Sequence, residues 1–202
     1  MIGVVDYQMG NLASLINSLA KIDRAAFVAR KADDLAHCEK LILPGVGAFG
    51  DAAKHLKESG LDEAIKDFVR SGRYILGVCL GLQIMFEGSE ESEGAAGLGF
   101  FKGKVTRFDP ARAAHPIKIP HMGWNEIISR RPSRLFTNLA DRERLYFVHS
   151  YHAPLEAASA TSFYGYDFAS AVESDNIFGV QPHPEKSHNA GLTILRNFAD
   201  MR

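Results

Sequence analysis

The first half of this sequence alternates short apolar runs with amphipathic segments, and this alternation constrains the fold more than any other feature. Apolar runs of strand length occupy residues 2–6, 25–29, 40–44 and 73–78. Residues 11–22 and 61–72 instead repeat apolar side chains at helical spacing, with Asn11 placed to cap the first helix and Gly72 to end the second. Strands interleaved with helices predict a mostly parallel sheet covered on both faces, with ligands at the carboxyl ends of its strands.

The pattern changes after about residue 98, where short strands and turns predict a small antiparallel excursion. Further strands are expected within 144–152 and 176–187, followed by a closing helix near 188–201. No internal repeat or linker divides the chain, and 202 residues are enough for one domain with a substantial core. We therefore expect a single α/β domain over residues 1–202, with a mostly parallel central sheet flanked by helices.

Composition excludes several classes of protein and partner. The hydrophobic fraction is 46% and the charged fraction 23%, which is typical of folded enzymes rather than disordered or fibrous chains. The formal charge is -1 and no long run of Lys or Arg occurs, so we expect no nucleic-acid partner. The N-terminus has no basic leader and no apolar run approaches membrane-spanning length. We expect a cytoplasmic protein with no membrane partner.

The strongest chemical signal is GVCLG at residues 77–81, where a cysteine lies between two glycines after an apolar run. A strand-to-helix turn this tight needs glycines two residues before and after the nucleophile. We expect Cys79 to stand exposed at the start of a helix, where free N–H groups and the helix dipole favour its thiolate. An inert buried cysteine is the alternative, and for Cys38 it is the favoured one. Their spacing gives no support to a disulfide framework.

A cysteine nucleophile needs a base that is itself oriented by a third group, and QPHPE at residues 181–185 supplies both. His183 follows an apparent strand, at the end where a parallel sheet presents its site. Glu185 is near enough in sequence to hold the imidazole, and the flanking prolines restrict the turn. Alone, His183 could equally cap a strand. Together with Cys79 it predicts a Cys-His-Glu catalytic triad.

The Gly-rich loop at residues 45–50 has two interpretations. Its G-x-G-x-x-G spacing matches a dinucleotide-binding turn, which would make the chain a nucleotide-dependent oxidoreductase. That turn normally follows the first strand and requires an acidic residue at the end of the next one, whereas the acidic residues within 62–67 fall in a helix-like segment. The interpretation that we favour is an oxyanion hole, formed by backbone N–H groups of this loop at Gly47 and of Leu80.

The remaining histidines and the single tryptophan carry weaker signals. No histidine pair has the H-x-x-x-H spacing of a helical metal site, and His149 and His152 would point apart on a strand. We therefore expect no metal and no other cofactor. Trp124 is either a core residue or an exposed anchor for a partner.

The motifs together resemble the triad-type, or class I, glutamine amidotransferases, and more closely the glutaminase subunits of imidazole glycerol phosphate synthases. The shared stretches run from residue 6 to 187 and include GNL at 10–12, LPGVGAF at 43–49, GVCLGLQ at 77–83, HMGWN at 121–125, YFVHSY at 146–151 and HPEKS at 183–187. The resemblance implies that glutamine forms a thioester on Cys79, that His183 protonates the departing ammonia, and that water then releases glutamate. It implies that the backbone end of L-glutamine is held by Gln83, Glu91, Ser150 and Tyr151.

The resemblance also implies a (β/α)8-barrel cyclase partner in a heterodimer, which uses the ammonia to make imidazole glycerol phosphate in histidine biosynthesis. It implies a docking face that includes Asn11, Trp124, Tyr146 and Lys186. Because glycines let a peptide rotate, we expect docking to bias the 45–47 loop between two orientations, only one of which aims an N–H at the oxyanion.

Two positions depart from the family pattern. Leu82 stands where Met is frequent, which is a mild apolar change, and Pro182 stands where an aromatic residue is usual. Since proline has no N–H, we expect the strand end before His183 to be an edge or bulge position, or to turn the missing donor toward solvent. The glutaminase subunit of another ammonia-using synthase and a catalytically inactive scaffold of the same fold remain as further interpretations.

Overall fold

The computed structural model describes residues 1–10 and 12–202, so the expected helix cap at Asn11 lies outside the described residues. The helices are α1 (Leu12–Ala20), α2 (Ala32–Leu35), α3 (Phe49–Glu58), α4 (Leu61–Arg70), α5 (Leu80–Gln83) and α6 (His188–Asp200). The strands are β1 (Ile2–Val5), β2 (Ala26–Ala29), β3 (Lys40–Leu43), β4 (Tyr74–Val78), β5 (Phe86–Ser89), β6 (Phe101–Arg107), β7 (His121–Ser129), β8 (Arg142–His149), β9 (Tyr151–His152), β10 (Ala158–Phe163), β11 (Asp167–Ser174) and β12 (Ile177–Val180). The α and β segments expected in the first half all overlap these elements.

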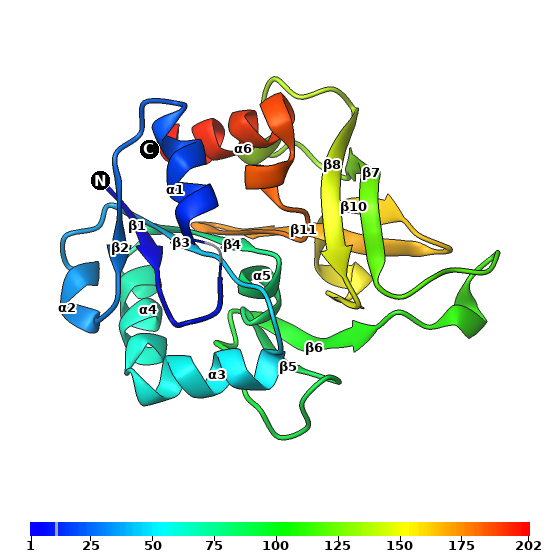
Figure 1. Cartoon of the computed structure of the whole chain (residues 1–202), viewed down its shortest axis with the longest axis horizontal. Coiled ribbons are helices and arrows are strands. Elements are labelled where there is room, and N and C mark those ends of the chain that lie inside the picture. Colours follow the sequence, from blue (N-terminus) through cyan, green and yellow to red (C-terminus); the bar gives the residue numbers. More distant parts are fainter. Residues whose placement is uncertain (11) are drawn as a thin grey trace.

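Within the described residues, nine strands form one sheet in the order β2-β1-β3-β4-β12-β11-β10-β7-β8, and β5-β6-β9 form a smaller one (Figure 1). The strands from β2 to β12 in that order are parallel. The rest of the large sheet, from β11 to β8, is antiparallel. The antiparallel part is therefore larger than the excursion that the sequence predicted, because it continues the parallel sheet through the pairing of β11 with β12.

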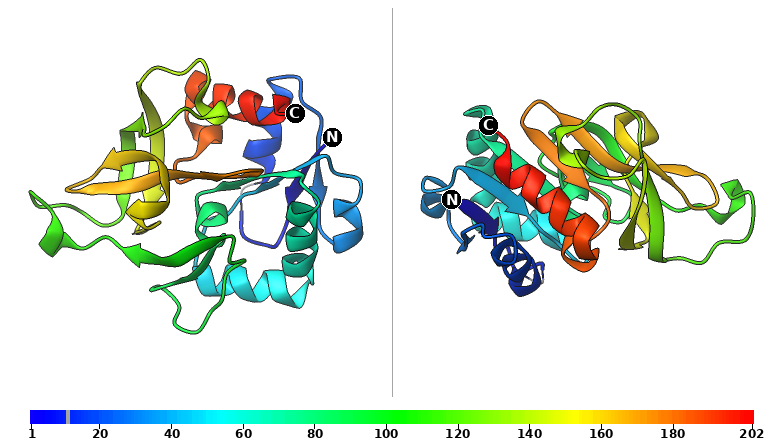
Figure 2. Two further views of the ribbon diagram at one scale, coloured as in Figure 1. Left: turned by 180° about the vertical axis from the view of Figure 1, so that it is seen from behind. Right: turned by 90° about the horizontal axis from the view of Figure 1, so that it is seen from above.

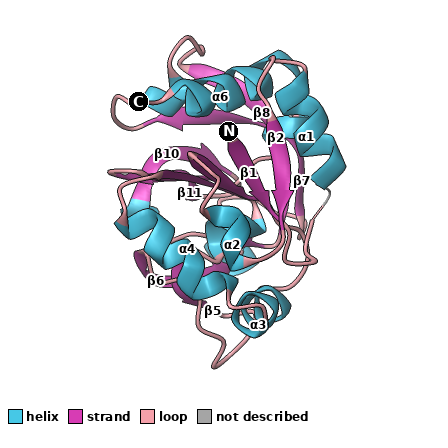
Figure 3. Cartoon of the chain, turned by 90° about the vertical axis from the view of Figure 1, so that its left-hand side faces the viewer, coloured by secondary structure: helices cyan, strands magenta, loops and turns pink. Residues whose placement is uncertain are grey.

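Successive side chains of the parallel strands point to opposite faces of the sheet, and each face has its own apolar core. Ile42 and Leu76 pack in a cluster with the apolar faces of α1 and α6, whereas Leu41, Leu43 and Ile75 pack with those of α3 and α4. Figure 3 shows the sheet between these two layers of helices. Each large apolar side chain buried in this way contributes roughly 1.5–3 kcal/mol. Both chain ends lie at the end of the molecule opposite β7 and β8 (Figure 2).

The order of the strands brings the triad residues together. β4 and β12 are parallel neighbours, with Val78 opposite Val180. Cys79 directly follows β4, and His183 comes three residues after β12 ends. Parallel neighbours end at the same edge of the sheet, so two residues far apart in sequence meet there.

Of the alternatives expected for Pro182, the edge position does not hold, because β12 is a central strand between β4 and β11. Pro182 nevertheless interrupts no ladder, since β12 ends at Val180. On either side of it, Gln181 N–H donates to Ser170 and His183 N–H donates to Tyr146, which lie on different strands. The missing donor therefore falls where the chain leaves one partner strand for another.

Two further segments differ from expectation. The helix expected after Cys79 is only the single turn α5, because the chain turns into β5. The strand expected over residues 144–152 is broken at Ser150 into β8 and β9. No described helix is long and apolar enough to cross a membrane.

Candidate active site

The turn between β4 and α5 requires the glycines on either side of Cys79. Cys79 itself has a positive φ of 54°, which is uncommon for a residue with a side chain. A Cβ at Gly77 would lie 2.6 Å from the carbonyl oxygen of Gly81, and one at Gly81 would lie 1.7 Å from that of Leu43. The glycine requirement predicted from the motif is therefore confirmed.

The thiol environment differs from the prediction in two ways. The Cys79 side chain is only 6% exposed, rather than standing out from the turn, because β8 and the 181–183 segment cover it. Because α5 is a single turn, its dipole adds little to thiolate stability. A neutral donor is present instead: Gln181 Nε2 lies 3.6 Å from Cys79 Sγ.

His183 and Glu185 form a buried pair beside the thiol. Glu185 Oε1 accepts the Nδ1–H of His183 at 2.8 Å, which leaves Nε2 as the nitrogen that exchanges a proton. His183 Nε2 is buried and makes no hydrogen bond of normal geometry, so it is free to exchange a proton with a bound substrate. Burial, the largest single effect, lowers the pKa of His183, but Cys79 and Glu185 together raise it to about 10. The arrangement therefore favours an imidazolium next to the thiol.

A cavity of about 420 Å³ opens onto Cys79. The four residues assigned to glutamine by the resemblance all line it: Gln83, Glu91, Ser150 and Tyr151. Glu91 is held in place because its Oε2 accepts the N–H of Phe49 at 2.7 Å. Gln83 is already engaged, since its Nε2 donates to the Tyr151 carbonyl at 2.9 Å and to Gln181 Oε1 at 3.1 Å. Gln83 thus lines the cavity and also holds another lining residue, Tyr151, in place.

The Gly-rich loop lines the same cavity through Val46 and Gly47. Gly47 has a φ of 110°, a conformation that a side chain would disfavour. The Leu80 N–H, expected as the second oxyanion donor, instead donates to the carbonyl of Gly45 at 3.3 Å. The two proposed donors are therefore close to the thiol, but one of them is occupied.

The dinucleotide interpretation of this loop is not supported by its position. The loop follows β3, which is neither the first strand of the chain nor at the end of a sheet. The acidic residues Asp62 and Glu63 lie in the first turn of α4 and not at the end of the following strand. A ribose therefore has no acidic partner where that motif requires one.

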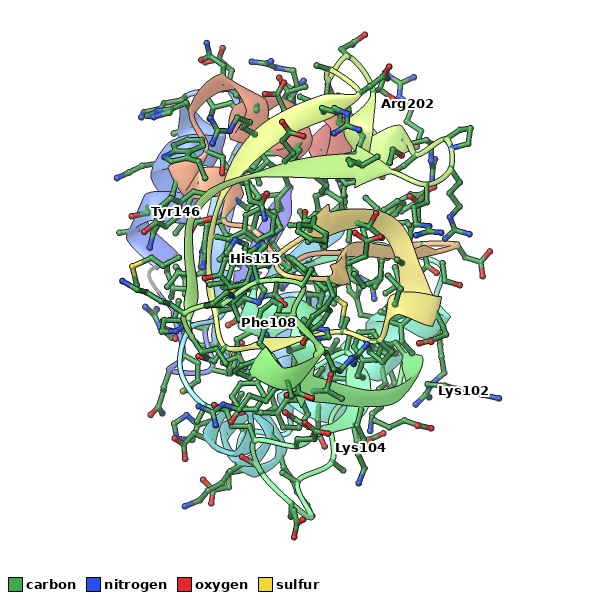
Figure 4. The ribbon with its side chains drawn as sticks, turned by 90° about the vertical axis from the view of Figure 1, so that its right-hand side faces the viewer. Lys102, Lys104, Phe108, His115, Tyr146 and Arg202 are labelled. Carbon is green, nitrogen blue, oxygen red and sulfur yellow. The ribbon has the colours of Figure 1, made fainter. Side chains whose placement is uncertain are left out.

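The proposed docking residues gather on one surface, apart from Asn11, which lies outside the described residues. Trp124 is 40% exposed, so it is not a core residue. It lies opposite Tyr146 across β7 and β8, with ring centroids 6.0 Å apart. Lys186 Nζ lies 5.8 Å from the centre of the Tyr146 ring. Figure 4 shows Tyr146 at the margin of the molecule.

Sequence reasoning missed several residues around the site. His188 stacks on Trp124, with ring centroids 5.1 Å apart and planes at 10°. Gln181 contacts the nucleophile, and its nearness to His183 in the sequence was the available signal. His149 and His152 were expected to point apart, yet both rings pack on Phe108, because the break at Ser150 changes the direction of the chain.

Comparisons with known proteins identify the family of the chain. Residues 3–201 match the family described as glutamine amidotransferase class-I. The chain is 51% identical to imidazole glycerol phosphate synthase subunit HisH of Sulfurimonas denitrificans, over 100% of this chain and 99% of that protein. The identity is 47% with the protein of the same name from Wolinella succinogenes (100% of both chains) and 43% with that from Bacillus subtilis (100% and 96%).

Solved structures share the fold at lower sequence identity. A crystal structure of a glutamine amidotransferase superposes with a TM-score of 0.75 at 18% identity, covering 98% of this chain and 96% of that one. A structure of PurLQS from Thermotoga maritima gives a TM-score of 0.71 at 21% identity, covering 98% and 96%.

Proposed function

Because the chain belongs to the class I glutamine amidotransferase family, we propose that it is the glutaminase subunit of an imidazole glycerol phosphate synthase. It hydrolyses L-glutamine to glutamate and ammonia, and the ammonia passes to a cyclase subunit that forms imidazole glycerol phosphate in histidine biosynthesis. The observation that carries the activity is that Cys79 and His183 follow two neighbouring parallel strands at the same edge of the sheet, with His183 Nδ1 held by Glu185.

The reaction uses the three triad residues in separate roles. The raised pKa of His183 favours the state in which the proton given up by the Cys79 thiol already lies on Nε2, and from that state the sulfur attacks the side-chain carbonyl carbon of glutamine. The tetrahedral intermediate collapses as His183 returns that proton to the departing nitrogen, releasing ammonia and leaving a thioester. Water, deprotonated by the same nitrogen, then attacks the thioester and releases glutamate. Glu185 keeps the Nδ1–H oriented throughout and stabilises the imidazolium.

The cavity beside Cys79 is the proposed binding site for glutamine. Its volume of about 420 Å³ is ample for an amino acid. The Glu91 carboxylate is suited to the substrate's α-ammonium group, and Ser150 and Tyr151 border the end where its backbone would lie. Gln83 acts mainly by fixing Tyr151, since its side-chain N–H groups are already bonded.

The oxyanion hole is proposed to form at Gly47 and Leu80. A negatively charged oxygen on the tetrahedral carbon needs two donors aimed at it. Release of the Leu80 N–H from Gly45 would provide the second donor. The occupied state of this donor supports a site whose activity depends on rearrangement of the loop.

The partner that we propose is a (β/α)8-barrel cyclase, docked as a heterodimer on the surface that carries Trp124, Tyr146 and Lys186. An exposed tryptophan that stacks on His188 and meets Tyr146 edge-on is a suitable anchor, because these contacts hold it in place before docking. We assign Asn11 to this surface on family resemblance alone. Residues 1–202 act as one glutaminase domain in the cytoplasm, without a cofactor.

Reconstitution with the cyclase tests this function. The complex should form imidazole glycerol phosphate with either glutamine or free ammonia as nitrogen source, and should release glutamate only in the first case. Replacing Cys79 with Ala should remove glutamine-dependent synthesis and leave ammonia-dependent synthesis intact. NAD-dependent turnover without glutamate release would support the oxidoreductase, and binding without any turnover would indicate the inactive scaffold.

A further inference from the structure

A chain of hydrogen bonds crosses the interior between β7 and the glutamine cavity. His121 of β7 and His149 of β8 lie directly opposite each other and are 4% and 6% exposed. His121 Nδ1 lies 2.9 Å from His149 Nε2, and His149 Nδ1 lies 2.8 Å from the carbonyl oxygen of Tyr151. Neither histidine belongs to the triad.

The direction of every proton in this chain follows from the acceptor at its end. A carbonyl oxygen can only accept, so His149 Nδ1 carries the hydrogen and Nε2 of the neutral ring is an acceptor. His121 Nδ1 must therefore donate to it, which leaves His121 Nε2 to accept from the side-chain N–H of Asn125 at 3.3 Å. The Asn125 amide agrees with this orientation, because its Oδ1 accepts the N–H of Glu126 at 2.8 Å.

The Tyr151 carbonyl also receives a second chain, which begins at the nucleophile. Gln83 Nε2 donates to this carbonyl and to Gln181 Oε1. Gln181 Nε2 then approaches Cys79 Sγ at 3.6 Å. The Tyr151 carbonyl oxygen thus accepts the last hydrogen bond of both chains, the one from β7 and the one from the thiol.

Phe108 packs against both histidine rings, which are buried, although His149 also borders the glutamine cavity. Its ring centroid lies 6.1 Å from that of His121 and 5.2 Å from that of His149, and its N–H donates to the Ser150 carbonyl at 3.0 Å. Figure 4 shows Phe108 near the centre of this side of the molecule. Burial lowers the pKa of His121 to about 4 and holds that of His149 well below its ordinary value. Both rings are therefore neutral near pH 7, as the chain requires.

We propose that His121 and His149 are positioning residues for glutamine hydrolysis, which fix the Ser150–Tyr151 turn relative to the strand that carries Trp124. The proposal rests on the glutaminase function proposed above. Loss of the His149 donor leaves the Tyr151 carbonyl with one partner fewer, so the turn that borders the substrate becomes less fixed. If the two histidines served only the core, replacing them would lower stability without changing KM for glutamine.

The test compares steady-state kinetics of variants in the complex with the cyclase. His149→Leu removes the donor, and we expect KM for glutamine to rise about tenfold while kcat changes less than about threefold. His149→Asn places an amide N–H near the position of Nδ1, so KM should stay within about twofold of the unsubstituted complex.

The matched control is His152→Leu. His152 is 5% exposed and also packs on Phe108, but it bonds Ala153 and Tyr166 instead of Tyr151. This variant should lower the melting temperature and leave KM unchanged. Equal changes of KM in His149→Leu and His152→Leu, or no change in His149→Leu, would overturn the proposal.

A spectroscopic measurement on the unsubstituted protein covers the case in which His149→Leu fails to fold. Nitrogen chemical shifts of both imidazoles at pH 7 should report neutral rings protonated at Nδ1. A ring of His149 protonated at Nε2 would overturn the proposal whatever the kinetics show. Absence of glutaminase activity in the unsubstituted complex would overturn the function itself, and the imidazole shifts distinguish that failure from failure of the hydrogen-bond chain.

Discussion

The carbonyl oxygen of Gly45 accepts the backbone N–H of Leu80 at 3.3 Å, so a donor proposed for the oxyanion hole is occupied. Freeing it requires only a local change of the Gly45-Val46-Gly47 segment, because its two glycines tolerate peptide rotation. Loss of one oxyanion donor typically lowers kcat by about 100- to 1,000-fold. The loop is therefore suited to hold the enzyme inactive until a partner docks.

We expect slow glutamine hydrolysis by the chain alone and a rise of about three orders of magnitude when the cyclase and its nucleotide ligand are added. Trp124→Ala should weaken this activation, since Trp124 is the proposed anchor. Leu155→Ala is a suitable control, because Leu155 is equally exposed at 40% but lies outside the proposed docking surface. Glutamate release by the free chain and by the complex checks the prediction, and equal rates would refute the loop switch while leaving the triad untouched.

The close approach of Gly81 to Leu43 gives a second prediction. A methyl group at Gly81 would lie 1.7 Å from a backbone oxygen, so Gly81→Ala should destabilise the protein by roughly 2–4 kcal/mol or prevent folding. Gly88→Ala is the control, because its nearest contact would be an ordinary 3.5 Å. Urea denaturation of both variants provides the comparison. Similar midpoints would show that the elbow does not need this glycine.

The two cysteines should react differently with alkylating reagents. Cys79 lines the glutamine cavity, whereas Cys38 is 3% exposed, and burial raises the pKa of its thiol. We expect iodoacetamide to modify Cys79 first and to inactivate the complex, with protection by glutamine. Cys38→Ala should keep both the reactivity and the activity. Inactivation that depended on Cys38 would remove Cys79 as the nucleophile.

The sequence predicted the meeting of Cys79 and His183 because it predicted a parallel sheet. Residues that follow parallel strands lie at one edge whatever their separation in sequence, and β4 and β12 are neighbours. The glycine pattern around Cys79 was informative for a different reason, because the steric requirement is local to the turn.

Features that depend on the antiparallel half were beyond prediction. Cys79 is buried partly because β8 covers it, and the position of β8 follows from a register that no local pattern encodes. The pairing of His121 with His149 depends on the same register. Pro182 led us to expect an edge, a bulge or a donor position turned to solvent, because proline cannot donate within a ladder, but the sequence does not reveal that the strand ends two residues earlier, at Val180.

The order of effects within the triad is a further prediction. His183→Ala removes both the base and the acid and should abolish turnover, whereas Glu185→Gln only weakens the orientation of the imidazole and should retain more activity. Because the Cys79 contact raises the pKa of His183, Cys79→Ala should lower it. Glutaminase rates and the imidazole titration measure these effects. A more damaging Glu185→Gln would reverse the assigned roles.

The buried histidines around Phe108 should make the protein sensitive to acid. The pKa of His121, His149 and His152 is lowered in the folded protein, chiefly by burial, while in the unfolded chain each returns to about 6.5. Below pH 6.5 the unfolded chain therefore binds protons that the folded protein does not. Their contribution to stability is complete above that pH and is lost as the pH falls toward 4.

The expected slope is about 1.4 kcal/mol per pH unit for each histidine that gains its proton only on unfolding. His183 does not offset this loss, because its raised pKa contributes stability that is complete below pH 6.5 and is lost as the pH rises toward 10. Urea denaturation between pH 6.5 and 5 measures the slope, because the contribution of His183 is constant over that range. His121→Asn should reduce it and the exposed His115→Gln should not, whereas a stability that rose on acidification would contradict the neutral state of the cluster.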